Sequence, residues 1–268
     1  MQILACADDT DIISRSPKSL QEATVALDRA ARRMGLEINQ AETKYMICGI
    51  KKKYVENVFK VKHLTFERVN SFLYLGTSIT ADNNTYAEIN NRITLDNRSY
   101  FGLVNTLKAK NISRKCKVVM YKTLIKPVLM YGAETWVLSK ADELHLGVFE
   151  RIILRTIYGP ICEGATWSSR YNEELYRLYE ETDLLTTIRI TRLRLAGNIL
   201  RVQDNLPCKK ITLDKPEGRR RFGRPNLRWI GGVMRDADRL GVRNWRIKTK
   251  DRDGWRRLLE STKTLHGL

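Results

Sequence analysis

The chain has 268 residues, with 48 Lys and Arg against 30 Asp and Glu, and a formal net charge of +18. Its 43% hydrophobic content excludes a disordered chain, and its positive charge favours polyanionic partners. The five widely spaced cysteines and three separated histidines exclude a disulfide framework and a zinc knuckle. Because no apolar run approaches the ~20 residues of a membrane span and no signal-peptide pattern opens the chain, we predict no membrane partner and an intracellular location, in the nucleus or cytoplasm.

The first eighty residues predict mainly β-structure. Two short apolar runs, 2–7 and 10–14, flank Asp8 and Asp9 and indicate a β-hairpin with these two acids at its tip. Ser16 and Pro17 then predict the start of a helix, which Gly35 ends. Further short strands are predicted at 36–38, 44–48, 58–62 and 72–79.

After about residue 84 the spacing of apolar residues becomes helical. Ile89, Ile93 and Tyr100 predict one long helix, and Ser113 can cap a second helix that should kink at Pro127. More helices are predicted at 141–157, 171–180, 184–202, 226–240 and 251–263, while 204–228 reads as a loop. The predicted order is therefore β-rich, then helical, then basic and loop-rich.

The pair Asp8 and Asp9 is the strongest candidate for a chemical site. Adjacent acids between apolar strands are costly unless they face water or a cation. Carboxylates at a rigid turn provide the hard oxygen ligands that Mg²⁺ prefers, and two-metal nucleotidyl transfer uses such ligands. The alternative is an ordinary hydrophilic turn.

Several motifs carry a resemblance to a known family. Residues 6–13, CADDTDII, resemble the Ala-Asp-Asp box of reverse transcriptases, and 34–39 with 43–46 look like the palm motif that follows it. Phe72, Tyr74, Leu75 and Gly76 belong to a segment that looks like the primer-grip turn. Residues 125–136 and the tail are also similar, so the chain resembles, over nearly its whole length, the C-terminal part of a non-LTR (LINE-type) retrotransposon reverse transcriptase.

This resemblance implies an α+β fold in three parts. Residues 1–80 would be the C-terminal half of a palm, 81–203 a mostly helical thumb-like region, and 204–268 a basic loop and helical tail. The implied function is that of a fragment of an RNA-directed DNA polymerase, or endonuclease-reverse transcriptase, with Asp8 and Asp9 as ligands of Mg²⁺. We expect Asp11 to be an exposed acid on the second strand of the hairpin.

The chain departs from this family at three places. Reverse transcriptases need a third carboxylate on an upstream strand, but the seven residues before Asp8 include no acid. We therefore expect a chain truncated at its N-terminal side, which holds Mg²⁺ poorly and does not polymerise alone. Glu42 stands where the family usually has Lys, although Lys44 on the same strand face could partly replace that lysine at a phosphate. Gly231 and Gly232 weaken the helix predicted at 226–240, by roughly 1 kcal/mol each.

The last quarter of the chain carries most of the excess charge. Residues 201–268 hold 19 Lys and Arg against 8 Asp and Glu. Arginine guanidinium groups bind phosphate oxygens, so the cluster predicts contact with RNA and DNA; the alternative is a solvated basic loop. The predicted binding residues are Arg219, Arg220, Arg221, Arg224 and Arg228.

The aromatic residues are interpreted mainly as packing. Trp229, Trp245 and Trp255 could stack on bases, but we favour the core of a small helical tail. Trp136 and Trp167 are expected in the core, and packing is favoured for Tyr121 and Tyr131 over a contact with primer.

Two rival functions remain beside the polymerase fragment. One is a non-catalytic nucleic-acid-binding module that uses the thumb-like region and tail, and the other is a decayed element remnant. The missing third carboxylate favours these two for the isolated chain. The sequence makes no prediction of an oligomeric state.

Overall fold

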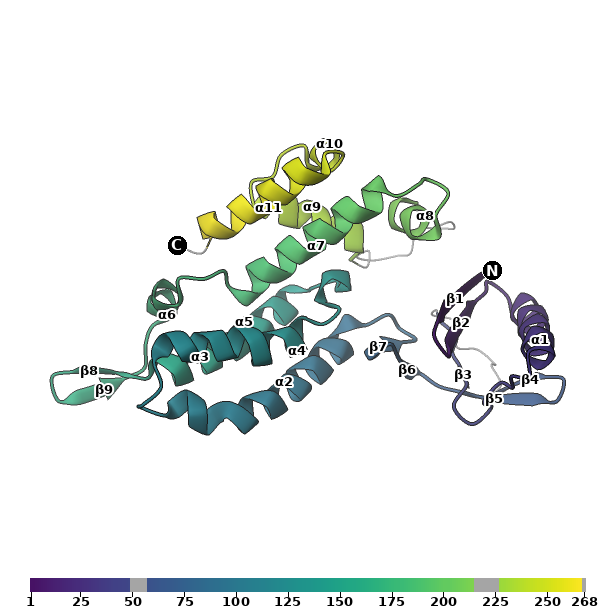
Figure 1. Ribbon diagram of the computed structural model, residues 1–268, viewed down its shortest axis with the longest axis horizontal. Coiled ribbons are helices and arrows are strands. Elements are labelled where there is room, and N and C mark those ends of the chain that lie inside the picture. Colours follow the sequence, from purple (N-terminus) through teal and green to yellow (C-terminus); the bar gives the residue numbers. More distant parts are fainter. Residues whose placement is uncertain (49–56, 215–226, 267–268) are drawn as a thin grey trace. The chain divides into compact units, whose positions relative to one another are not determined.

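The protein combines helices with small sheets, as expected for the α+β class. The computed structural model describes residues 1–48, 57–214 and 227–266 (Figure 1). The chain divides into two compact units, Met1–Glu88 and Ile89–Leu268. Among the described residues, no helix combines the length and apolarity needed to cross a membrane.

The first unit contains seven short strands and one complete helix in its described residues. Ser16 caps this helix by accepting a hydrogen bond from the backbone NH of Ser19, which confirms the predicted start. The strands form two antiparallel hairpins and a three-stranded sheet of order β3-β5-β4, in which β3 is parallel to β5. The elements are β1 (Gln2–Cys6), β2 (Asp9–Ile13), α1 (Pro17–Arg33), β3 (Lys44–Tyr45), β4 (Val58–Val61), β5 (Leu64–Arg68), β6 (Ser71–Tyr74) and β7 (Thr77–Thr80).

The strand predictions need four corrections. Residues 36–38 form no strand, and the strand predicted at 44–48 has only two residues. The segment 72–79 is a hairpin, because Leu75 and Gly76 both have positive φ and reverse the chain between β6 and β7. β5 was not predicted, although it pairs with both other strands of its sheet.

The first unit has a small core. Three of its described side chains, Val61, Leu64 and Phe66, form a buried cluster. Tyr45 and Phe59 stack beside this cluster with ring centroids 4.8 Å apart. So few buried side chains provide limited hydrophobic stabilisation.

The second unit is mostly helical. All the helices predicted after residue 84 are present, with ends shifted by a few residues. The structure adds α8, α10 and a hairpin of β8 and β9, which were not predicted. Its elements are α2 (Thr85–Lys108, beginning in the first unit), α3 (Arg114–Met120), η1 (Tyr121–Ile125), α4 (Lys126–Met130), η2 (Ala133–Thr135), α5 (Lys140–Tyr158), β8 (Ile161–Glu163), β9 (Thr166–Ser168), α6 (Asn172–Tyr179), α7 (Leu184–Arg201), α8 (Pro207–Leu213), α9 (Trp229–Arg239), α10 (Trp245–Lys248) and α11 (Arg252–His266).

The expected distortion near Pro127 takes the form of a π-helical turn. The predicted cap at Ser113 is confirmed, because its side chain accepts a hydrogen bond from the NH of Cys116. Before Pro127 the helix widens over Tyr121–Ile125, and the NH of Lys126 donates to the carbonyl of Tyr121, five residues back. Proline lacks an NH and its ring crowds the carbonyl four residues earlier, so the wider turn relieves both problems.

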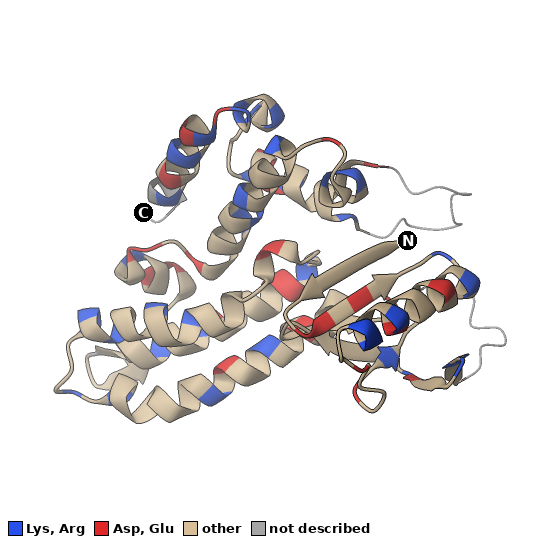
Figure 2. Cartoon of the chain, turned by 45° about the vertical axis from the view of Figure 1, so that its right-hand side comes forward, with Lys and Arg blue, Asp and Glu red and all other residues tan. Residues whose placement is uncertain are grey.

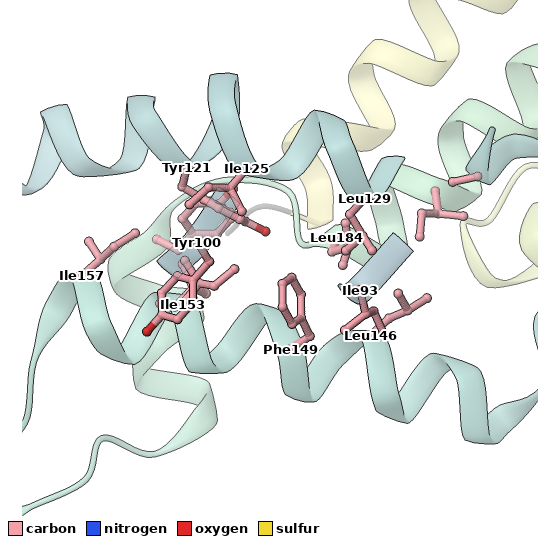
Figure 3. Packing of buried hydrophobic residues seen from close by; sticks show 14 of the residues in the cluster. Ile93, Tyr100, Tyr121, Ile125, Leu129, Leu146, Phe149, Ile153, Ile157 and Leu184 are labelled. Atoms are coloured by element: carbon pink, nitrogen blue, oxygen red, sulfur yellow. The ribbon is translucent and has the colours of Figure 1, made fainter. Parts of the chain in front are cut away.

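A core of aliphatic and aromatic side chains joins α2, η1, α4, α5 and α7 (Figure 3). Tyr121 and Trp136 are each 1% exposed, which confirms both packing predictions. The prediction for Tyr131 is wrong: its ring is 51% exposed and lies 4.5 Å from the guanidinium carbon of Arg92. Trp167, which is 71% exposed, was also wrongly expected in the core.

Glu150 is the polar centre of this core. Its carboxylate accepts hydrogen bonds from the hydroxyls of Tyr121 (3.1 Å) and Tyr176 (3.3 Å). It also accepts from the backbone NH of Leu184 (3.0 Å), the first residue of α7. Burial raises the pKa of Glu150, against the opposing influence of Lys126. One buried carboxylate thus connects α5, η1, α6 and the start of α7.

A second cluster of buried side chains joins α7, α9 and α11. Trp245 and Trp255 lie within it, which confirms that they pack in the tail. The helix weakened by Gly231 and Gly232 nevertheless forms, as α9. A Cβ at Gly232 would lie 3.2 Å from Nη1 of Arg192, and that same nitrogen donates to buried Asp236 at 2.7 Å. Glycine at this position therefore leaves room for a buried ion pair between α7 and α9.

Candidate functional site

The two acids of the carboxylate turn have different positions in the hairpin. Cys6 pairs with Asp9, so the turn consists of Ala7 and Asp8, and Asp9 is the first residue of β2. This corrects the prediction that Asp8 and Asp9 together form the tip. Ala7 has φ of 53°, in the left-handed region that favours glycine. A two-residue hairpin turn needs a positive φ at its first residue, and this conformation of Ala7 positions Asp8 in the turn and Asp9 on the strand.

Asp11 shares a strand face with Asp9. Side chains two residues apart on a strand point to the same side, and the cross-strand partner of Asp9 is Cys6. Asp11 is half-buried rather than exposed as expected. Burial, and secondly the charge of Asp9, raise the pKa of Asp11. This face of the hairpin thus holds two interacting carboxyl groups.

Tyr74 is the primer-grip-like residue that lies near these carboxyl groups. Burial raises the pKa of its phenol, and Asp11, Cys6 and Asp9 raise it further. The phenol of Tyr74 is therefore within the electrostatic influence of Asp9 and Asp11. Phe72 is two residues earlier on β6, and Leu75 and Gly76 form the turn to β7. The backbone NH of Ser78 donates to buried Glu88 at 2.7 Å, which fixes this hairpin to the beginning of α2.

Lys44 lies apart from the carboxylates, on β3. Its ammonium forms an ion pair of 2.9 Å with Glu67 on β5, and both side chains are largely exposed. Glu42 is in the exposed turn before this strand. Exposed pairs contribute only ~0–1 kcal/mol, so the pairing leaves Lys44 accessible to a phosphate.

The acids of the hairpin do not by themselves form a complete set of metal ligands. No group of three or more His, Cys, Asp or Glu side chains suited to a metal occurs among residues 1–48, 57–214 and 227–266. Asp8 and Asp9 offer the hard oxygens that Mg²⁺ prefers, but both come from one turn. The donor chemistry fits magnesium, and a ligand from a second element is needed to complete the site.

Most of the basic tail is described, but the segment 215–226, which holds four of its predicted binding arginines, is not. Arg219, Arg220, Arg221 and Arg224 fall outside the described residues. Arg228 is exposed, and its guanidinium donates to the backbone carbonyl of Asp214 at 2.6 Å. It lines a mainly apolar pocket with side chains that include Ile199, Ile211 and Trp229. Nε1 of Trp229 donates to the carbonyl of Glu134, so this indole is tied to the protein.

A second basic region was not identified from the sequence. The 37 residues from 97 to 133 contain eight Lys and Arg and no Asp or Glu. Four of these cations surround the turn from α2 to α3 and are exposed (Figure 2): Lys108, Lys110, Arg114 and Lys115. The segments on either side, 81–96 and 134–200, each carry two more acidic than basic residues, so a charge count over a longer stretch partly offsets the charge of 97–133.

Comparison with known proteins connects the chain to mobile elements. It is 26% identical over 261 residues to an uncharacterized transposon-derived protein of Caenorhabditis elegans, covering 94% of this chain and 92% of that protein. The similarity indicates a transposon origin. The similarity extends across both compact units. No family model and no solved structure matches the chain.

Proposed function

We propose that the chain is a segment of the RNA-directed DNA polymerase of a non-LTR retrotransposon. In this function Asp8 and Asp9 contribute to the site of Mg²⁺, and Phe72, Tyr74, Leu75 and Gly76 contact the primer strand. The observation that carries the proposal is the tight β1–β2 hairpin, which has Asp8 in its turn and the adjacent Asp9 at the start of β2. The transposon-derived relative supports an origin in a mobile element.

The protein's own groups suggest how such a site would be organised. The turn at Ala7 fixes Asp8 and Asp9 on a short antiparallel hairpin, so neither carboxylate needs a long loop to hold it. Bound Mg²⁺ would supply the charge that stabilises the attacking and leaving oxygens. Burial is the main cause of the raised pKa of Asp11, and the negative charge of Asp9 adds to it, so a cation bound beside Asp9 would offset this second effect.

We expect the purified chain alone to show no primer extension with Mg²⁺ or Mn²⁺. A two-metal centre needs ligands from more than one element, and among the described residues no group of three or more His, Cys, Asp or Glu side chains could hold a metal. Primer extension on a homopolymer RNA template measures this activity. Extension that disappears in Asp8→Ala would contradict the expectation.

A fusion that adds the remaining palm of a related reverse transcriptase tests the proposed roles directly. Asp8→Asn and Asp9→Asn should each abolish extension in this fusion, because either change removes a negatively charged ligand. Asp82→Asn, an exposed acid outside the hairpin, is the matched control and should retain extension. An active fusion that tolerates both hairpin changes would disprove the metal assignment.

A non-catalytic nucleic-acid-binding module is the second candidate. It is favoured by the net charge of +18 and by the incomplete set of metal ligands among the described residues. Here the tail arginines and Lys44 would contact the phosphates of RNA or DNA without sequence preference. A decayed element remnant would have the same charges without a selected role.

A further inference from the structure

The β8–β9 hairpin and the short segment that follows it expose one aromatic side chain each to solvent. Trp167 is 71% exposed and Tyr171, three residues after the hairpin, is 82% exposed. Exposed aromatic rings of this kind are available to stack on nucleic-acid bases. Trp167 is also the most exposed of the five tryptophans, since Trp136, Trp245 and Trp255 are buried and Trp229 is half-buried.

The base of this hairpin is held firmly by arginines. Nε of Arg170 donates to the carbonyl of Gly159 at 3.0 Å, and the same side chain forms an ion pair with Glu174 on α6. Arg155 on α5 donates to the side-chain oxygen of Asn172 at 2.8 Å. These contacts fix both ends of the segment. Because this segment is already held in place, a ligand that binds at the aromatic residues would lose little free energy to the ordering of the chain.

The α2–α3 turn lies at the same end of the second unit. Arg114, the first residue of α3, acts electrostatically on Tyr158, the last residue of α5, and the hairpin begins three residues later. Figures 1 and 2 both show the turn and the hairpin at one end of the helices α2, α3 and α5. Among the described residues no carboxylate forms an ion pair with Lys108, Lys110, Arg114 or Lys115.

We propose that this end of the second unit binds single-stranded nucleic acid. The four cations of the α2–α3 turn contact phosphates, and Trp167 and Tyr171 stack on bases. An aromatic side chain can stack on a base only where that base is not already stacked on its neighbours. This requirement favours a single strand over a duplex. The inference rests on the nucleic-acid-binding part of the proposed function and is independent of the carboxylate turn.

Fluorescence anisotropy with labelled single-stranded RNA, single-stranded DNA and the matched duplex tests the proposal on the full chain. Trp167→Ala combined with Tyr171→Ala should weaken single-strand binding by about tenfold or more, because aromatic stacking contributes strongly for each base. Binding to the duplex should change little. Equal loss for single strand and duplex, or no loss, would overturn the base-stacking role.

The fluorescence of Trp167 provides a second readout. A stacked base should quench this tryptophan, so bound oligonucleotide should lower the emission of the wild-type chain. Trp167→Phe keeps an aromatic ring and should retain affinity while losing this quenching. Unchanged quenching in Trp167→Phe would show that another tryptophan reports binding and would reject the assignment. Circular dichroism and thermal unfolding check that the variants retain their fold.

The cations are tested by the salt dependence of affinity. Replacing Lys108, Lys110, Arg114 and Lys115 with Ala should flatten the log–log salt slope for a single strand by about 3, since each phosphate contact contributes about 0.7. Ala at Lys18, Arg29, Lys60 and Lys62, exposed cations of the first unit, lowers the net charge equally and should leave most of the slope. The same loss in both variants would reject a localised site.

The tail arginines form a separate arm of the experiment. Ala at Arg219, Arg220, Arg221 and Arg224 should flatten the slope on duplex DNA by roughly 3 if the tail binds phosphates. Trp167-dependent binding of a single strand should persist in this variant. Loss of that binding would overturn the proposed site, whereas an unchanged duplex slope would reject the tail as a binding surface and leave the site intact.

Discussion

Asp96 on α2 is an acidic residue within the hydrophobic core of the second unit. Its side chain is fully buried, and neither oxygen has a hydrogen-bond partner among the described residues. Burial raises the pKa of this carboxyl group from 3.8 to about 7. The folded protein therefore holds a proton at Asp96 under conditions where the unfolded chain has released it.

This raised pKa predicts a stability that falls as the pH rises. The stabilisation is fully present below the unfolded pKa and is lost as the pH passes through the folded pKa, since the folded state binds more protons between the two. We expect Asp96 to account for a loss of roughly 2–3 kcal/mol in the free energy of unfolding between about pH 5 and about pH 8.

Urea unfolding of Asp96→Asn across this range tests the prediction. The amide cannot ionise, so the variant should lose much of the pH dependence and become more stable than wild type at the alkaline end. Asp238→Asn, an exposed acid on α9, is the control and should keep the wild-type profile. The same pH profile in wild type and Asp96→Asn would contradict a buried titrating carboxyl group.

At the scale of elements, the approach of α11 to α7 depends on one glycine. A Cβ at Gly197 would overlap Nε1 of Trp255 and lie 2.8 Å from its Cδ1. Trp255 is 2% exposed and belongs to the core of the tail. A rigid buried indole has little room to move, so the bare backbone of Gly197 allows the two helices to pack.

Gly197→Ala should therefore destabilise the protein by roughly 1–3 kcal/mol through overpacking. Gly231→Ala is the matched change on α9, where a Cβ would meet nothing within 4 Å. That substitution should stabilise the helix by about 0.5–1 kcal/mol, because alanine has the higher helix propensity. Chemical unfolding at one pH compares the two, and a neutral Gly197→Ala would show that α11 adjusts its position.

At the scale of the whole molecule, the two compact units have very different cores. The second unit buries two large clusters, whereas the buried cluster described in the first unit has three residues. The β1–β2 hairpin exposes Ile3 (49%), Leu4 (43%) and Ile13 (50%), and its two strands pair only with each other among the described residues. An isolated two-stranded hairpin is marginally stable in water.

Hydrogen exchange should therefore find residues 2–14 much less protected than the helices around 115–135. The exposed apolar strands also have free edges, which promote pairing between molecules. Measurement at several protein concentrations separates the two effects, because self-association would raise protection with concentration. Equal protection of hairpin and helices in a demonstrably monomeric sample would refute the prediction.

Local sequence signals were sufficient for much of the fold. Ser16 and Ser113 are caps that act within their own helices, and their hydrogen bonds to Ser19 and Cys116 were predictable from residue type alone. The apolar spacing around Ile89, Ile93 and Tyr100 likewise requires only a helix with one buried face. Alpha-helix α8 was missed because Pro207 suggested a loop, although proline is well accepted in the first helical turn.

The carboxylate turn was also predictable, but its geometry was not. The sequence by itself determined a hairpin with acids at or beside its turn, since apolar strands and two adjacent aspartates are local features. Only the pairing of Cys6 with Asp9 decided that Ala7 and Asp8 form the turn. The influence of Asp9 and Asp11 on the pKa of Tyr74 likewise depends on the tertiary structure, because these residues are more than 60 positions apart in the sequence.

The predictions of which aromatic side chains are buried were partly correct and partly wrong. Trp136 and Trp167 are the same residue type and each follows a threonine, yet one is 1% exposed and the other 71%. The sequence alone determined the α+β composition, the basic charge and most helices, because these follow from residue type and local periodicity. Only the tertiary structure decided which aromatic and charged side chains face solvent and which elements meet, because those properties arise from contacts between residues far apart in the chain.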